Sequence, residues 1–222
     1  MDVKVKVCGL TNAADARAAM AAGADMLGFI FVPESPRHVT PEQVRDILAT
    51  VGHTELLTVG VFVNDSPETV AQVLSFCGLD LAQLHGEEPP AALGLDEGQS
   101  PVCGRAYKAL RPRTLEEASG LARQYALPPR LRGGGRLPAF LIDAYHPYRR
   151  GGTGVTGDWS LASSLAGQYP LLLAGGLAPA NVTQAVRSVQ PWGVDVSSGV
   201  EESPGQKDHD ALRAFVTAVK AA

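Results

Sequence analysis

The sequence predicts an α/β protein folded as one (β/α)₈ barrel over residues 1–222, and three observations support this fold. Short apolar or β-branched runs alternate with Ala-rich helical patterns along the chain. Eight such pairs in 222 residues amount to roughly 28 residues per unit, close to what a (β/α)₈ barrel needs. The glycine-rich turns follow the last three strands, whereas a doubly wound open sheet, the competing architecture, usually carries them after its first strand.

Eight segments have the composition of parallel strands that are buried on both faces, because such strands read as nearly continuous apolar runs. The segment MLGFIF at residues 26–31 is the clearest of them. The predicted strands are residues 3–8, 26–31, 56–63, 79–84, 105–110, 140–143, 171–174 and 193–196.

The helices between these strands are predicted from capping residues and from helical periodicity. Asn12 is the expected N-cap of a first helix that stops at Gly23, since asparagine caps helix N-termini and glycine favours the left-handed C-cap. Thr40 precedes a second helix with Pro41 at its first position, and Ser66-Pro67 opens a third. Further helices are predicted at residues 115–125, 159–165, 179–188 and 208–220.

Two stretches are predicted to be irregular spacers. Residues 94–104 form a polar loop, and residues 127–138 (LPPRLRGGGRLP) are rich in Pro, Gly and Arg and are expected to be mobile. Because the alternation of strands and helices resumes on both sides of each stretch, neither is predicted to be a domain boundary.

Composition limits the partner and the compartment. The net charge is −4, from 19 basic and 23 acidic residues, with no basic stripe, which argues against nucleic acid and anionic membranes as partners. The cysteines Cys8, Cys77 and Cys103 show no C-x-x-C spacing and fit a reducing cytosol better than a disulfide framework. No signal peptide or membrane span is expected, since no run approaches 18 apolar residues. We therefore expect a cytoplasmic protein.

In a barrel of this kind the active site lies at the C-terminal ends of the strands. Three glycine turns are expected there: the GGTG turn that ends at Gly154, the pair Gly175 and Gly176, and the pair Ser198 and Gly199. Unsatisfied main-chain N–H groups at such turns bind anions, and barrel enzymes often bind phosphate after their seventh and eighth strands. A single glycine pair is more often an ordinary turn, but three sets at one end favour a phosphate site.

Asp143 and Cys8 are the candidates for acid–base chemistry. Asp143 follows the apolar residues 139–142 and is predicted to lie at a strand end in a partly dry cleft. Removing water raises the pKa of a carboxyl group, which suits a general acid; the alternative is an aspartate that caps the next loop. Cys8 shares its strand face with Lys4 and Lys6, and that face includes the barrel interior. A buried cysteine is usually inert packing, but this thiol can act as a base if nearby charges lower its pKa.

The remaining polar candidates are His85 after the fourth strand, Asp195 in the eighth, and Arg37 in the loop after the second. His85 fits a catalytic group and a polar wall equally well. Arg37 is suited to gripping a carboxylate through two parallel hydrogen bonds, although a loop arginine is as often simply solvated. No H-E-x-x-H motif or cysteine cluster in the sequence points to a metal site.

Eight motifs occur in order along nearly the whole chain. They are KVCGLT at residues 6–11, GFIF at 28–31, SPR at 35–37, GVFVN at 60–64, QLHG at 83–86, GGTG at 151–154, AGGL at 174–177 and VDVSSGVE at 194–201. Single pieces such as AGGL occur in many barrels, but the ordered set resembles the phosphoribosylanthranilate isomerase family of tryptophan biosynthesis.

The resemblance implies a (β/α)₈ barrel that performs an Amadori rearrangement with no cofactor or metal. It implies that Cys8 is the general base, that Asp143 is the general acid and that Arg37 holds the anthranilate carboxylate. The glycine turns would hold the phosphate of a small-molecule phosphosugar, bound by a monomer or a homodimer. The sequence departs from the family pattern at residues 155–157, where VTG replaces a lysine-containing stretch, and in the long spacer at residues 127–138.

Two rival functions stay open. Indole-glycerol-phosphate synthase is another phosphate-binding barrel, but it relies on lysine and glutamate residues at strand ends, whereas Lys108 lies within the fifth predicted strand. A phosphosugar-binding barrel without catalysis would need the glycine turns but not Cys8 together with Asp143.

Overall fold

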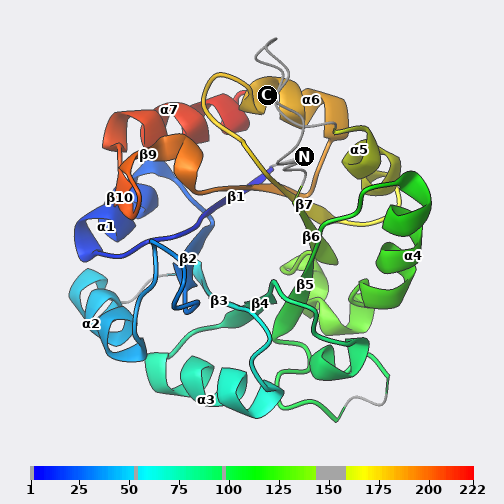
Figure 1. Cartoon of the computed structure of the whole chain (residues 1–222). Coiled ribbons are helices and arrows are strands. Elements are labelled where there is room, and N and C mark those ends of the chain that lie inside the picture. The colour runs from blue at the N-terminus through cyan, green and yellow to red at the C-terminus, as the bar shows by residue number, and fades with distance from the viewer. Residues whose placement is uncertain (1–2, 53–54, 97–98, 144–158) are drawn as a thin grey trace.

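The computed structural model describes residues 3–52, 55–96, 99–143 and 159–222 and shows eight parallel strands closed into a barrel, with helices outside (Figure 1). The strands are β1 (Lys4–Val7), β2 (Met26–Ile30), β3 (Leu57–Phe62), β4 (Leu81–Leu84), β5 (Ala106–Leu110), β6 (Phe140–Asp143), β7 (Leu171–Ala174) and β8 (Gly193–Val196). Each corresponds to a predicted strand, with ends that differ by one or two residues at most, so the predicted barrel is confirmed. Closure pairs β8 with β1 and places Lys6 opposite Asp195.

The helices around the barrel begin and end largely at the predicted caps. They are α1 (Ala13–Ala22), α2 (Pro41–Val51), α3 (Pro67–Cys77), α4 (Leu115–Tyr125), α5 (Ser160–Ala166), α6 (Val182–Val189) and α7 (His209–Lys220). The Asn12 side chain accepts a hydrogen bond from the Asp15 N–H, and Gly23 ends α1 in the left-handed conformation with φ of 93°. Thr40 and Gln43 form a reciprocal capping box at the start of α2.

The prediction that the sixth helix begins at residue 179 is wrong, because a polar side chain holds that stretch in a turn. Asn181 Oδ1 accepts a hydrogen bond from the Ala178 N–H at 2.9 Å, and its Nδ2 donates to the Gly176 carbonyl at 2.9 Å. Asparagine competes for backbone groups in this way at helix starts. The turn after β7 is thereby fixed, and α6 begins only at Val182.

The spacer at residues 127–138 closes the N-terminal end of the barrel and is not a loose connection. It contains the 3₁₀ turns η2 (Pro129–Leu131) and η3 (Gly133–Gly135). Leu127 and Leu137 are buried within the apolar cluster of the barrel interior, and the Trp192 indole N–H donates to the Gly135 carbonyl at 3.3 Å. The leucines near the two ends of the spacer complete the interior cluster, and the mobility of the segment between them stays a prediction.

After β8 the chain forms the 3₁₀ turn η4 (Ser198–Val200) and a small hairpin that the sequence did not predict. Its strands are β9 (Glu201–Ser203) and β10 (Gln206–Lys207). The hairpin lies beside α1 and α7 (Figure 1). Among the helices that the structure describes, none is long and apolar enough to cross a membrane.

Candidate active site

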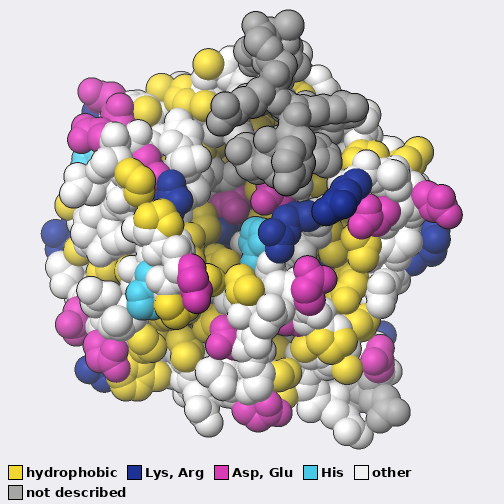
Figure 2. Space-filling model, in the orientation of Figure 1, with side chains coloured by type: hydrophobic (Ala, Val, Ile, Leu, Met, Phe, Trp, Pro, Cys, Tyr) yellow, Lys and Arg dark blue, Asp and Glu magenta, His cyan; other side chains and the backbone are white. Residues whose placement is uncertain are grey.

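The C-terminal ends of the strands surround a cavity of about 340 Å³, in the hollow at the centre of the face seen in Figure 2. Its lining comes from seven of the eight strands or the residues just after them: Cys8, Ile30, Val61, Gln83, His85, Asp143, residues 174–177, Asp195 and residues 197–199. Eight of the ten predicted site residues therefore meet in one place. Of the other two, Arg37 lies beside the cavity, and Gly154 lies outside the described residues.

Cys8 reaches this cavity directly from the end of β1. Its N–H donates to the Val196 carbonyl at 2.8 Å, and its side chain is 5% exposed. Lys6, two residues earlier, is fully buried in the barrel interior, so the predicted alternation along β1 places both side chains inside the barrel. Burial raises the pKa of the Cys8 thiol; the Lys6 ammonium acts in the opposite direction but does not outweigh burial.

Lys6 and Asp195 form a buried ion pair beneath Cys8. The Lys6 Nζ lies 3.0 and 3.1 Å from the two carboxylate oxygens of Asp195, whose side chain is 9% exposed. Burial, the largest single effect, lowers the pKa of Lys6, but Asp195 together with Cys8 and Tyr107 outweighs it and raises that pKa, so the ammonium stays charged. Sequence reasoning assigned no role to Lys6, although a lysine between valines of a buried strand was a signal.

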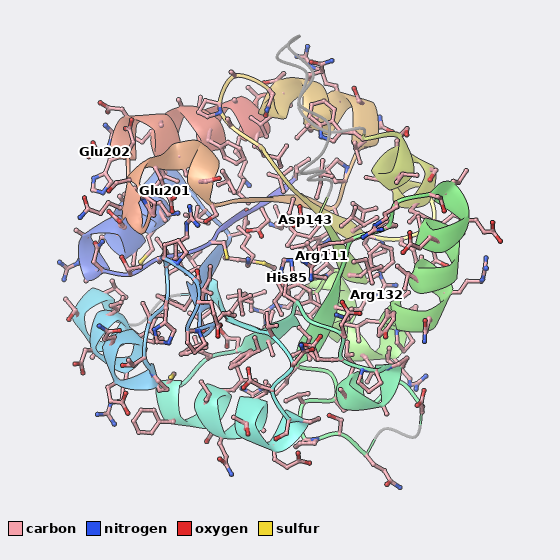
Figure 3. All side chains as sticks on the ribbon, viewed as in Figure 1. His85, Arg111, Arg132, Asp143, Glu201 and Glu202 are labelled. Carbon is pink, nitrogen blue, oxygen red and sulfur yellow. The ribbon has the colours of Figure 1, made fainter. Side chains whose placement is uncertain are left out.

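His85 faces Asp143 across the mouth of the barrel (Figure 3). The His85 Nε2 lies 3.7 Å from Asp143 Oδ2. The Tyr107 hydroxyl donates to Gln83 Oε1 at 3.0 Å, so the Gln83 amide nitrogen must be the group that meets His85 Nδ1 at 2.9 Å. A neutral imidazole then carries its proton on Nε2, the nitrogen that faces Asp143.

The glycine turns after β7 and β8 require glycine. Gly175 and Gly176 have φ of 98° and 66°, in the left-handed region that other residues rarely adopt. A Cβ at Gly199 would lie 1.9 Å from the Leu177 carbonyl oxygen, so only glycine fits. The neighbouring Ser197 hydroxyl is buried in the cavity wall without a hydrogen-bond partner among the described residues. The two turns thus present backbone and a hydroxyl at one side of the cavity.

Arg37 is tied to an internal carboxylate that the sequence analysis did not consider. Its Nε donates to Glu201 Oε1 at 2.8 Å and its Nη2 to Oε2 at 2.6 Å. Burial raises the pKa of Glu201, but hydrogen bonds from Arg37 and Lys207 outweigh burial and hold it below its ordinary value. Nη1 of Arg37 makes no hydrogen bond to a described residue. The predicted carboxylate-binding arginine therefore has only part of its guanidinium available.

Lys207 joins Arg37 and Glu201 to the C-terminal end of β1. Its ammonium, buried completely, donates to the carbonyls of Cys8 at 2.7 Å and Ser197 at 3.1 Å and to Glu201 at 2.7 Å. The side chain of Arg37 crosses Gly9, where a Cβ would lie 2.6 Å from Arg37 Cδ. Lys207 and Glu201 thus connect the hairpin, the loop after β2 and the Cys8 backbone.

Arg111 is a further residue at the mouth that sequence reasoning missed. Its Nη2 donates to the His85 carbonyl at 2.8 Å, and together with Asp143 it lines a neighbouring cavity of about 750 Å³. Figure 3 shows it beside His85 and Asp143. The signal was the RPR sequence at residues 111–113, directly after the apolar end of β5.

Comparisons with known proteins agree with this geometry. The family model described as N-(5′-phosphoribosyl)anthranilate (PRA) isomerase matches residues 5–218. The isomerase of that name from Geobacter sulfurreducens is 45% identical over 218 residues, which cover 98% of each chain. The crystal structure of phosphoribosylanthranilate isomerase from Thermotoga maritima superimposes with a TM-score of 0.81 at 38% identity, covering 99% of this chain and 100% of that one.

A second solved structure, of a phosphoribosylanthranilate isomerase in complex with reduced 1-(o-carboxyphenylamino)-1-deoxyribulose 5-phosphate, has a TM-score of 0.78 at 35% identity, and the match covers 99% of this chain and 100% of that chain. The family resemblance that the ordered motifs predicted is confirmed. The chain belongs to the N-(5′-phosphoribosyl)anthranilate isomerase family.

Proposed function

We propose that this chain converts N-(5′-phosphoribosyl)anthranilate to 1-(2-carboxyphenylamino)-1-deoxyribulose 5-phosphate in tryptophan biosynthesis, with Cys8 as general base and Asp143 as general acid. One observation carries the assignment of roles. Cys8 follows β1 and Asp143 ends β6, and the strands between them around the barrel, β7 and β8, carry the glycine turns. A substrate whose phosphate binds those turns would extend its ribose between the thiol and the carboxyl group.

The chemistry requires one proton to be given and another to be taken. Asp143 gives a proton to the ribose ring oxygen; the C1′–O bond breaks towards that oxygen, and the nitrogen lone pair forms a protonated C1′=N bond. The Cys8 thiolate takes the proton from C2′, the C2′–H pair forms a C1′=C2′ bond, and the C=N pair returns to nitrogen. The resulting enolamine tautomerises to the aminoketose. Each acid–base step contributes about 10²- to 10⁴-fold.

The substrate's charged ends need separate partners. We assign the phosphate to the main-chain N–H groups of Gly175, Gly176, Ser198 and Gly199 and to the corresponding groups at Gly154. We assign the anthranilate carboxylate to Arg37, through the edge of its guanidinium that does not face Glu201. We assign His85, whose Nε2 lies 3.7 Å from Asp143 Oδ2, to positioning that carboxyl group, and Asp195 acts through Lys6.

We further propose one barrel domain over residues 1–222, a cytoplasmic location, a phosphosugar as partner, and a monomer or homodimer in solution. A structure of the Thermotoga maritima enzyme describes monomers generated from a dimeric form, which supports both assemblies within the family. Light scattering on the purified protein distinguishes a monomer of 23.2 kDa from a dimer of twice that mass.

Steady-state turnover of N-(5′-phosphoribosyl)anthranilate, followed by the fall in its fluorescence, tests the function. The wild-type chain should turn it over, and Cys8→Ser should lose about 10²- to 10⁴-fold in kcat while folding normally. The reason is that a serine hydroxyl is far less acidic than a thiol with a pKa of about 8.5. Cys103→Ser is the matched control. Binding without turnover would indicate a non-catalytic barrel, and full turnover by Cys8→Ser would leave the thiol as packing only.

A further inference from the structure

Two charged side chains lie inside a barrel interior whose other layers are largely apolar. Lys6 is fully buried and Asp195 is nearly so, yet the interior cluster around them consists of residues such as Met26, Val59 and Leu172. Burying an ion pair costs solvation energy, and well-packed apolar side chains of similar size often stabilise a protein as much or more. The pair therefore calls for a role other than holding the barrel together.

The position of the pair points to that role. The Lys6 ammonium donates to Asp195 at 3.0 Å, and Lys6 precedes Cys8 on the same face of β1, so its charge acts directly on the thiol. Gly28 on β2 leaves room for both side chains, because a Cβ there would lie 3.0 Å from Cys8 Sγ and 3.2 Å from Lys6 Cε. The thiol and the ammonium thus come from β1 and the residue that follows it, the carboxylate comes from β8, and the glycine of β2 leaves space beside them.

We propose that Lys6 and Asp195 are positioning residues for the base: Lys6 stabilises the deprotonated sulfur of Cys8, and Asp195 limits that stabilisation. The inference deepens the proposed function and rests on it for its catalytic meaning. A thiolate that is stabilised too strongly is a weak base, and one that is not stabilised is never formed near neutral pH. The Lys6 ammonium stabilises the thiolate and the Asp195 carboxylate opposes that effect, so the basicity of the sulfur lies between these limits.

Other charged or titratable groups also face Cys8. Lys207 and Arg37 approach from the hairpin and from the loop after β2 and share the single carboxylate of Glu201; Lys207 also lowers the pKa of Cys8, but less than Lys6 does. Tyr107 faces it from β5, and burial raises the pKa of its phenol, so that group stays neutral. His85 and Asp143 act on Asp195 from across the cavity rather than on the sulfur directly.

Titration of the thiolate absorbance of Cys8 tests the proposal without using the enzyme assay. In a Cys77→Ser/Cys103→Ser background Cys8 is the only thiol. Lys6→Met should raise the titration midpoint by about one pH unit or more, since an adjacent opposite charge shifts a pKa by about 1–3 units. Asp195→Asn should lower the midpoint, because the carboxylate that opposes the thiolate is gone. Shifts in the same direction, or no shift in either variant, would overturn the proposal.

Lys4→Met is the matched control, because Lys4 lies on the same face of β1 and pairs with Asp25 at 3.0 Å, but at the other end of the barrel. It should leave the midpoint unchanged. If Lys6→Met does not fold, Asp195→Asn and the double variant decide: Asp195→Asn must lower the midpoint, and the double variant must titrate above it. Full turnover by Cys8→Ser would refute the base but not the pair, whereas unshifted midpoints would refute the pair alone.

Discussion

The orientation of His85 shows how single residues determine the chemistry of the mouth. Tyr107 fixes Gln83, and Gln83 fixes the imidazole tautomer, so an N–H group faces the carboxyl group of Asp143. The carboxyl group, 3.7 Å from His85 Nε2, is 22% exposed and able to meet substrate. We propose that His85 positions this carboxyl group and that Asp143 transfers the proton, and a variant of Asp143 can separate the two contributions.

Asp143→Asn should lower kcat by about 10²- to 10⁴-fold with little change in KM, because the amide keeps the shape of the carboxyl group but supplies no proton. Steady-state kinetics measures both constants, and circular dichroism confirms folding. Asp46→Asn, an exposed position on α2, is the control and should be silent. Near-normal kcat in Asp143→Asn would indicate an aspartate that only caps the next loop.

At the scale of elements, the turn after β7 lines the cavity, and the hairpin after β8 holds Arg37 in place. The first presents left-handed glycines held by Asn181, and the second anchors Arg37 through Glu201. Each is a short irregular segment whose geometry depends on a polar side chain, not on apolar packing. A substitution in the turn after β7 should therefore affect substrate binding, whereas a substitution in the hairpin should affect stability.

Gly176→Pro should raise KM and weaken competition by inorganic phosphate. Proline lacks the N–H donor and cannot adopt the observed φ of 66°. Gly78→Pro makes the same substitution at φ of 71°, at the end of α3 and away from the cavity, so it should cost stability without changing KM. An unchanged KM in Gly176→Pro would place the phosphate elsewhere.

Glu201→Gln should lower the free energy of unfolding at pH 7 by about 3–5 kcal/mol, since it leaves the buried Lys207 without its charge partner. The folded-state pKa of Glu201 lies below its ordinary value, so its contribution is full above the unfolded pKa and is lost as pH falls through the folded one. The difference from wild type should therefore shrink in acid. Urea unfolding at neutral and acid pH measures it.

Glu202→Gln is the matched control for that experiment, because the neighbouring glutamate points outward and is exposed (Figure 3). Its unfolding free energy should stay within about 0.5 kcal/mol of wild type. A Glu201→Gln variant that behaved in the same way would mean that Arg37 and Lys207 are held without the carboxylate.

At the scale of the whole molecule, the barrel is open for chemistry at one end and packed closed at the other. Its C-terminal end carries the polar cavity, while Leu127 and Leu137 of the long spacer complete the apolar interior at the N-terminal end. This division between function and stability at the two ends is typical of (β/α)₈ barrels.

Leu137→Ala should cost about 2–5 kcal/mol of unfolding free energy, the usual range for truncating a buried leucine, and leave kcat/KM unchanged. Urea unfolding and steady-state kinetics on the same sample measure the two effects. Leu115→Ala, at a leucine that is 54% exposed, is the control and should change stability by no more than about 0.5 kcal/mol. An equally small loss in Leu137→Ala would mean that the spacer does not support the barrel.

The sequence by itself determined the features that depend on neighbouring residues. Asn12 and Thr40 cap helices because their side chains reach N–H groups three residues ahead, and the period of two along β1 places Cys8 inside the barrel. The order of the strands was enough to predict that Asp143 and the glycine turns after β7 and β8 lie at the same mouth, because all parallel strands of a closed barrel end on one side.

Only the tertiary structure decided which charges meet. Lys6 and Asp195 are 189 residues apart and become neighbours when β8 closes against β1. Arg37 and Glu201 are 164 residues apart and meet through a hairpin that has no strong local signal. The register of barrel closure selects these pairs, and that register depends on the packing of all eight strands together. For this reason the sequence predicted which residues line the cavity, while the charges that act on Cys8 and Arg37 are brought there by the fold.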